Sequence, residues 1–266
     1  MTTVRDVMHS GLITCEPNTL LADVAALLRK HRIHALVVTD GDKGPVGVVS
    51  DTDLLAGEWL GTTDENVAVL RRMTAGELMS KPPATITASS TVEKAAAEIR
   101  RLHVARLLVT DGLAPIGVLS ESDLMAALPR HPARREKVSD VMSWGYVACS
   151  PHTPVDGAVR AMHERDSRSL VVINDRGSLV GVLTGFDLLA CLSGESPIDG
   201  GVAGLMKEPI TIGPDDTLQA AINLMLDKSI HRLVVVDQSR PGGPPLGIIS
   251  TTDIMVEMVS PDSAWR

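Results

Sequence analysis

One phrase occurs four times in this chain of 266 residues, and it limits the possible folds more than any other feature. Each copy contains a glycine, two aliphatic residues, Ser or Thr, two variable residues, an aspartate, and Leu or Ile. The copies begin at Gly47, Gly117, Gly181 and Gly247, so they lie 70, 64 and 66 residues apart. Because a repeat of this length holds one small supersecondary unit, we expect four similar units rather than one large domain.

Other sequence features recur in the same order around each copy of the phrase. An apolar run that predicts a strand precedes it, and these runs begin at Leu36, Leu107, Leu170 and Leu233. Fifteen residues before each run, a segment starts with apolar residues at helical spacing. Each unit opens with a short segment ending in methionine; these are Met8, Met79, Met142 and Met206. The pattern predicts an α+β fold of four β-α-β-β-α repeats, each a small sheet covered by helices.

The landmarks divide the chain into four repeats and two modules. The predicted repeats are residues 1–60, 74–130, 137–194 and 201–260. A unit this small buries too little surface to be stable alone, so we expect repeats 1 and 2 to pair, and repeats 3 and 4. The polar, proline-bearing segment 129–137 is typical of a linker, which predicts modules 1–133 and 134–266.

The hydroxyl and the aspartate of the repeated phrase have two interpretations. Ser or Thr followed three residues later by an acid is a capping box, which stabilises a helix N-terminus by about 1 kcal/mol. A capping box favours Glu or Gln at that fourth position, however, and all four copies have Asp. A helix N-terminus with a hydroxyl also favours a phosphate, and a carboxylate one turn further can accept two hydrogen bonds from a ribose.

The repeat and its phrase resemble the CBS domain family, as two tandem CBS pairs (Bateman modules) that cover nearly the whole chain. The repeat organisation is similar to that of the regulatory gamma subunit of AMP-activated protein kinase. The resemblance implies adenosine ligands such as AMP, ADP, ATP or S-adenosylmethionine in clefts between paired repeats, with phosphate at the hydroxyl and ribose at the acid. The implied contacts are Ser50 and Asp53, Ser120 and Asp123, Thr184 and Asp187, and Ser250 and Asp253.

Two further sets of residues are ligand candidates. Each repeat places a basic side chain just before its apolar strand, where the charge would complement phosphate: His34, Arg106, Arg168, His231 and Arg232. The alternative is a solvated charge at the corner between helix and strand. The first short strand carries a hydroxyl at Thr14, Thr85 and Thr211, which family members often use for ligand contact. Strand preference of β-branched residues explains these threonines nearly as well.

Charge and composition limit the other classes of function. The net charge of −8 argues against binding of nucleic-acid polymers. No run of 18 apolar residues or secretory leader is present in the sequence, so we expect a cytoplasmic protein without a membrane span. Cys15, Cys149 and Cys191 are too few for a disulfide framework, and the first two are expected to be strand residues. We predict no metal site and no catalytic residues.

We therefore expect a stand-alone regulatory protein, not an enzyme, that binds an adenosine-type ligand and signals to an unknown client protein by conformational change. Its repeats would form a disc within one chain or through a homodimer. The alternative is a structural interaction module that binds no ligand and uses its Ser/Thr-x-x-Asp phrases only as helix caps.

The residue directly after the hydroxyl of the phrase suggests a difference between the two modules. It is Asp51 or Glu121 in the first two repeats, but Gly185 or Thr251 in the last two. Because an acid beside a phosphate repels it, we expect the C-terminal module to bind AMP, ADP or ATP better. The N-terminal module would then suit a less anionic compound such as S-adenosylmethionine.

Overall fold

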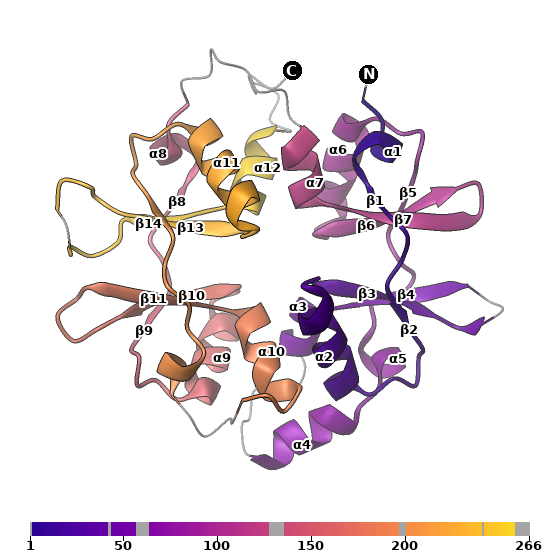
Figure 1. The fold of residues 1–266 in the computed structure, drawn as a ribbon, viewed down its shortest axis with the longest axis horizontal. Helices are drawn as coiled ribbons and strands as arrows, with labels where there is room; N and C mark the ends of the chain where they lie inside the picture. Colours follow the sequence, from indigo (N-terminus) through magenta and orange to yellow (C-terminus); the bar gives the residue numbers. More distant parts are fainter. Residues whose placement is uncertain are drawn as a thin grey trace. The chain divides into compact units, whose positions relative to one another are not determined.

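The computed structural model describes residues 2–41, 44–56, 64–127, 136–196, 201–240 and 242–258. Four small sheets, one for each repeat, are covered by helices (Figure 1). The predicted α+β class and the four β-α-β-β-α units are therefore confirmed. Residues 129–135 of the expected linker lie outside the described residues.

The first two repeats have the predicted element order. Repeat 1 contains α1 (Val4–Val7), β1 (His9–Ser10), β2 (Thr14–Cys15), α2 (Leu21–His31), β3 (Ala35–Thr39), β4 (Pro45–Ser50) and α3 (Asp51–Ala56). Helix α4 (Asp64–Arg72) follows it. Repeat 2 contains α5 (Ala75–Leu78), β5 (Thr85–Thr87), α6 (Val92–Leu102), β6 (Arg106–Asp111), β7 (Ala114–Ser120) and α7 (Glu121–Ala127).

The last two repeats follow the same order. Repeat 3 contains α8 (Val138–Val141), β8 (Ser143–Trp144), β9 (Ala148–Cys149), α9 (Val155–Glu164), β10 (Ser169–Ile173), β11 (Leu179–Thr184) and α10 (Gly185–Leu192). Repeat 4 contains the 3-10 helix η3 (Val202–Gly204), β12 (Thr211–Ile212), α11 (Leu218–Lys228), β13 (Arg232–Val235), β14 (Gly247–Ser250) and α12 (Thr251–Met258). In each repeat a short strand pairs in parallel with a central strand, and the central strand forms an antiparallel hairpin with the strand that ends in the repeated phrase. These trios are β2, β3 and β4; β5, β6 and β7; β9, β10 and β11; and β12, β13 and β14.

Local sequence explains the long helices. In α6, the Thr91 hydroxyl accepts the backbone N–H of Lys94 at 3.3 Å and thereby caps the first turn. Ala95 and Ile99, one turn apart, are buried against the sheet. The helix ends at Leu102, and the next residue, His103, has a φ of 54° that takes the chain out of the helical conformation.

The opening segment of each repeat packs on the neighbouring repeat rather than on its own. Strand β1, from the start of repeat 1, pairs with β7 of repeat 2, and β8 of repeat 3 pairs with β14 of repeat 4. In the opposite direction, Ser80 of repeat 2 pairs with Val48 on β4, and Lys207 of repeat 4 pairs with Val182 on β11. Repeats 1 and 2 therefore exchange their openings, and so do repeats 3 and 4.

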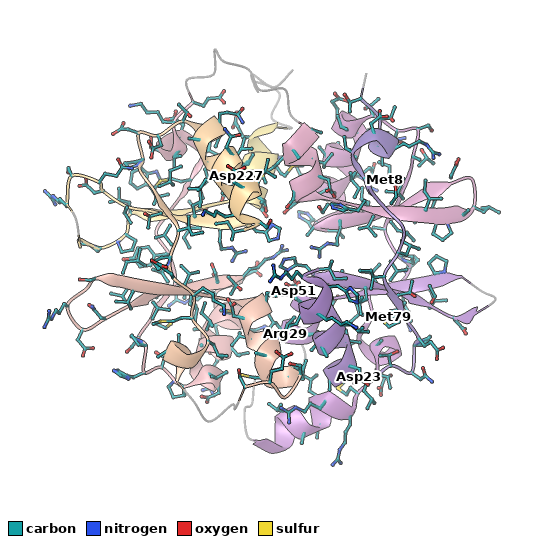
Figure 2. All side chains as sticks on the ribbon, viewed as in Figure 1. Met8, Asp23, Arg29, Asp51, Met79 and Asp227 are labelled. Atoms are coloured by element: carbon teal, nitrogen blue, oxygen red, sulfur yellow. The ribbon has the colours of Figure 1, made fainter. Side chains whose placement is uncertain are left out.

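This exchange explains two of the sequence landmarks. A Cβ at Gly47 would meet the sulfur of Met79, and one at Gly181 would lie 2.7 Å from the sulfur of Met206. Figure 2 labels Met79 and Met8, which belong to the openings of repeats 2 and 1. Gly117 faces the opening with Met8 and Gly247 the opening with Met142. The glycine of each phrase is thus required where the exchanged methionine segment approaches the strand closely.

The chain forms two compact units that do not follow the expected division at residue 133. Unit 1 comprises residues 1–12, 84–146 and 210–266, and unit 2 comprises residues 13–83 and 147–209. Helices join the repeats within a unit, because α10 of repeat 3 packs on α2 and α3 of repeat 1, and α12 of repeat 4 packs on α7 of repeat 2 (Figure 1). The modules 1–133 and 134–266 remain a proposal, which the exchange of openings supports.

The two units have differently connected cores. In unit 2, one apolar cluster contains buried residues of both repeats 1 and 3. In unit 1, repeats 2 and 4 have separate clusters, and each contributes one methionine to the other: Met125 lies in the core of repeat 4, and Met255 in the core of repeat 2.

Among the described residues, no helix is both long enough and apolar enough to cross a membrane.

Candidate functional site

The four copies of the repeated phrase adopt the same local structure. The Ser or Thr ends a strand, and a helix begins at the next residue. One oxygen of the aspartate, Oδ2, accepts both the hydroxyl and the backbone N–H of that Ser or Thr. The hydroxyl distances are 2.6 Å in Ser50–Asp53, 2.7 Å in Ser120–Asp123, 2.6 Å in Thr184–Asp187 and 2.5 Å in Ser250–Asp253. The aspartate N–H in turn donates to the hydroxyl, which completes a capping box.

The capping arrangement limits what these groups can offer a ligand. A hydroxyl has one proton, and here that proton is directed at Oδ2. Toward a ligand the hydroxyl is therefore an acceptor only, so other groups must supply the donors for a phosphate in this arrangement. The bonds of the cap use Oδ2, which leaves Oδ1 as the oxygen for contacts outside the phrase.

In three repeats, Oδ1 is met by a side chain from an exchanged opening. Ser80 Oγ donates to Asp53 Oδ1 at 3.3 Å, and Ser143 Oγ donates to Asp253 Oδ1 at 3.0 Å. His9 Nδ1 lies 2.8 Å from Asp123 Oδ1. None of these three partners was predicted as a site residue. Their position directly after the aligned methionines was the signal in the sequence that could have identified them.

The strand register places the predicted basic residues beside the phrase. Arg106 lies opposite Ser120, and Arg232 lies opposite Ser250. The carbonyl oxygens of His34, Arg168 and His231 accept the first backbone N–H of the final helix at 3.0, 3.3 and 2.9 Å. Arg168 is exposed and the other four side chains are half-buried. All five therefore lie beside the hydroxyl and the aspartate of a phrase. We call each such group, made of the phrase hydroxyl, its aspartate and the neighbouring basic residue, a corner.

The side chains of His34 and His231 lie close to polar groups of their own unit. His34 Nδ1 lies 2.7 Å from Asp51 Oδ2, and its ring packs against Phe186 of repeat 3 with centroids 4.9 Å apart. Figure 2 labels Asp51, the first residue of α3. His231 Nδ1 lies 3.2 Å from the hydroxyl of Ser122 in repeat 2. Residues of two different repeats thus meet at these corners.

Glu121, the acid in the phrase of repeat 2, contacts the phrase of repeat 4. The Glu121 carboxylate accepts the hydroxyl of Thr251 at 3.1 Å and that of Thr252 at 3.4 Å, and both threonines belong to repeat 4. The carboxylate that follows Ser120 in the sequence therefore also lies beside the phrase of repeat 4. The packing of α7 on α12 within unit 1 brings Glu121 there. Which module binds AMP, ADP or ATP better stays a prediction.

The predicted threonines lie apart from the phrase. Thr14, Thr85 and Thr211 are on β2, β5 and β12, which run parallel to the central strands, and lie opposite Val37, Leu108 and Val234. The phrase hydroxyl stands at the end of the strand on the opposite side of the central strand. The threonine and the hydroxyl are therefore separated by two strand spacings, each of about 4.8 Å. A small molecule of nucleoside size can span this separation, whereas a single phosphate group cannot. These threonines are exposed.

Thr85 also borders a polar hollow of about 250 Å³ in repeat 2. Its lining was not predicted and consists mainly of hydroxyls with one cation and one acid; the residues are Thr85, Ile86, Thr87, Ser90, Lys94, Glu98 and Thr110. The Thr87 and Ser90 hydroxyls bond each other at 2.9 Å.

The cysteines are expected to react slowly. Cys15 and Cys149 lie on equivalent strands, as predicted, and burial raises the pKa of Cys15, Cys149 and Cys191 to about 11. Because the thiolate is the reactive form, iodoacetamide at pH 7.5 should modify the native protein much more slowly than the urea-unfolded chain. Mass spectrometry over time measures this. Modification of any of the three at the rate of the unfolded chain would contradict the expectation.

The four repeats match a known protein family. The CBS domain profile matches residues 4–58, 75–130, 138–194 and 202–260. A solved structure from Methanocaldococcus jannaschii, proposed as an archaeal homologue of g-AMPK, has a TM-score of 0.82 and 19% identity. The match covers 96% of this chain and 99% of that one, and it supports the fold alone.

Two curated relatives cover parts of the chain. An uncharacterised protein of Methanocaldococcus jannaschii is 32% identical over 193 residues, which are 70% of this chain and 43% of that protein. The match thus spans less than half of that relative's length. Hypoxic response protein 1 of Mycobacterium tuberculosis is 28% identical over 131 residues, 49% of this chain and 88% of that protein.

Proposed function

The chain belongs to the CBS domain family, and from this premise we propose that it is a regulatory protein that binds an adenosine-type ligand at the Ser/Thr-x-x-Asp corners of its repeats. The ligand is AMP, ADP, ATP or S-adenosylmethionine. The aspartate accepts the ribose hydroxyls, and the basic side chains at the same corner, such as Arg106 and Arg232, attract phosphate. The threonines of the first strands contact the far end of the ligand.

The use of the two aspartate oxygens carries this proposal. Oδ2 holds the helix cap, while Oδ1 is approached from outside the phrase at Asp53, Asp123 and Asp253. A ribose hydroxyl is a hydrogen-bond donor like the serine hydroxyls that Oδ1 accepts at Asp53 and Asp253. The corner can therefore exchange a protein donor for a ligand donor without disturbing the cap.

Ligand binding would act on the arrangement of the repeats. Each corner combines groups from more than one repeat, as His231 with Ser122 and Glu121 with Thr251 illustrate. A ligand shifts an equilibrium between two arrangements only by its difference in affinity for them. The favoured arrangement presents a different surface to a client protein, which is how the signal is passed on.

Titration of the full chain tests ligand binding. AMP, ADP, ATP and S-adenosylmethionine are each added up to millimolar concentration while the unfolding temperature and the heat of binding are measured. A ligand present at 100 times its Kd should stabilise the protein by about 2.7 kcal/mol. Stabilisation by none of the four would contradict the proposal.

Asp253→Asn separates ligand binding from capping. The amide oxygen can take the place of Oδ2 and keep the cap, but the NH2 group then stands in the place of Oδ1 and cannot accept a ribose hydroxyl. We expect the variant to fold and to lose binding at repeat 4, measured as a lower stoichiometry by calorimetry. Asp237→Asn is the matched control, because Asp237 belongs to the same repeat and caps only its own turn. Unchanged binding in Asp253→Asn would contradict the assigned role of Oδ1.

The alternative function is an interaction module without a ligand. The completeness of the capping boxes in all four repeats favours it, since the hydroxyl and Oδ2 of each phrase are hydrogen-bonded to each other. This alternative predicts no heat of binding with any of the four compounds. It also predicts that Asp253→Asn and Asp237→Asn behave alike in every titration.

A further inference from the structure

The exchanged openings place different side chains on equivalent aspartates. The residue directly after the methionine is Ser80 at the Asp53 corner, His9 at the Asp123 corner and Ser143 at the Asp253 corner. All three contacts end on the same carboxylate oxygen, Oδ1. The position after the methionine, although remote in sequence from the phrase, is therefore part of each corner.

The serine corners and the histidine corner differ in what they offer a ligand. A serine hydroxyl that donates to Oδ1 keeps its own oxygen as an acceptor, so a ribose hydroxyl can donate to it or replace it. The contact of Ser80 with Asp53, at 3.3 Å, is also long and easily replaced. An imidazole Nδ1 that donates to a carboxylate leaves no acceptor on that nitrogen.

The side chain of Asp123 is also largely covered, and its partner His9 lies over it. The Asp123 side chain is only 7% exposed, whereas His9 is 81% exposed and lies over it at 2.8 Å. The short distance from His9 Nδ1 to Oδ1 is that of a hydrogen bond. A ligand that reaches Asp123 must first displace His9 from Oδ1.

We infer that the residue after the methionine determines which corners accept a ribose, and that His9 closes the Asp123 corner. This inference rests on the proposed function and adds to it a specificity-determining position supplied by the neighbouring repeat. The four corners are then unequal: those of Asp53 and Asp253 accept a ribose readily, and that of Asp123 does not.

The remaining corner differs again. Lys207 stands at the corresponding position of the opening that pairs with β11, next to the phrase that contains Asp187. A lysine is a donor without an acceptor, but its positive charge attracts phosphate. The repeat 3 corner therefore selects a ligand for its phosphate charge more than for its ribose.

Exchanging the residues between corners tests the inference. AMP is titrated by calorimetry into the wild-type chain and into His9→Ser, His9→Ala and Ser143→His. Because the imidazole no longer competes for Oδ1, both His9 variants should gain a site or bind AMP about tenfold more tightly at one site. Adding Asp123→Asn to His9→Ser should abolish the gain. Ser143→His should weaken one site.

Controls separate the possible outcomes. His152→Ser makes the same chemical change at an exposed position outside the phrases and should bind AMP as the wild type does. If the wild type binds AMP and both His9 variants bind it with the same stoichiometry and affinity, the inference is overturned while the proposed function stands. If neither the wild type nor any variant binds AMP or S-adenosylmethionine, the proposed function fails, and the inference fails with it.

Discussion

Replacing Gly247 by alanine is expected to lower the free energy of unfolding by about 2–3 kcal/mol. The added Cβ would meet the backbone carbonyl oxygen of Ser143 and lie 2.9 Å from the methyl group of Met142. A backbone atom paired in a sheet cannot move aside like a side chain, so the pairing of β8 with β14 must loosen. Urea unfolding followed by circular dichroism measures the loss.

The other phrase glycines provide a graded comparison. Gly117→Ala should cost as much as Gly247→Ala, because its Cβ also meets a backbone carbonyl, that of His9. Gly47→Ala and Gly181→Ala should cost less, since their nearest neighbours are the flexible side chains of Met79 and Met206.

A matched control distinguishes the close approach from a general effect of alanine. Gly204 has ordinary φ and no neighbour within 4 Å of a Cβ, so Gly204→Ala should change stability by less than about 0.5 kcal/mol. Equal losses in Gly247→Ala and Gly204→Ala would show that the exchanged openings do not require the phrase glycines.

Leu189→Ala should lower the free energy of unfolding by about 2–5 kcal/mol. Leu189 is fully buried in α10, a helix whose residues are buried on all sides except at Phe186. This helix packs on α2 and α3 of repeat 1, and the Arg71 guanidinium binds its last carbonyls, those of Cys191 and Leu192, at 2.6 and 3.1 Å. Truncation leaves a cavity between two repeats that such a tightly held helix cannot fill.

Val69→Ala is the control for this cavity. Val69 belongs to the same unit but is 61% exposed, so its truncation should change stability by less than about 0.5 kcal/mol. Thermal unfolding of both variants gives the comparison. A loss below 1 kcal/mol in Leu189→Ala would mean that the joint core of repeats 1 and 3 contributes little to the stability of unit 2.

The fold within each repeat could be predicted from the sequence because its causes are local. The helix that begins after Ser250 depends on a cap closed by Asp253, three residues away. Strand β3 (Ala35–Thr39) contains the apolar run predicted from Leu36, and it follows helix α2, whose apolar residues recur at helical spacing. The position of the basic residues beside the phrase could also be predicted, because the register of one hairpin places Arg232 opposite Ser250.

The partners of the aspartates could not be predicted in this way. Asp123 meets His9, which lies more than 100 residues earlier and in a segment that was assigned to repeat 1. Likewise Glu121 meets Thr251 because α7 and α12 pack together, not because of any spacing along the chain. The chemical character of each corner depends on such contacts, so the expected difference between the modules was based on neighbours along the chain alone.

By itself, the sequence determined four repeats, their order of elements, the capping phrase and the group of basic residues beside it. All of these depend on interactions within a few residues or within one hairpin. Only the tertiary structure decided which repeat receives each opening segment and which repeats share a helical core. The physical reason is that four similar sheets offer similar edges to each opening, so local pattern cannot select among them. Close packing of Met8 on Gly117 and of Met79 on Gly47 shows which pairing is formed.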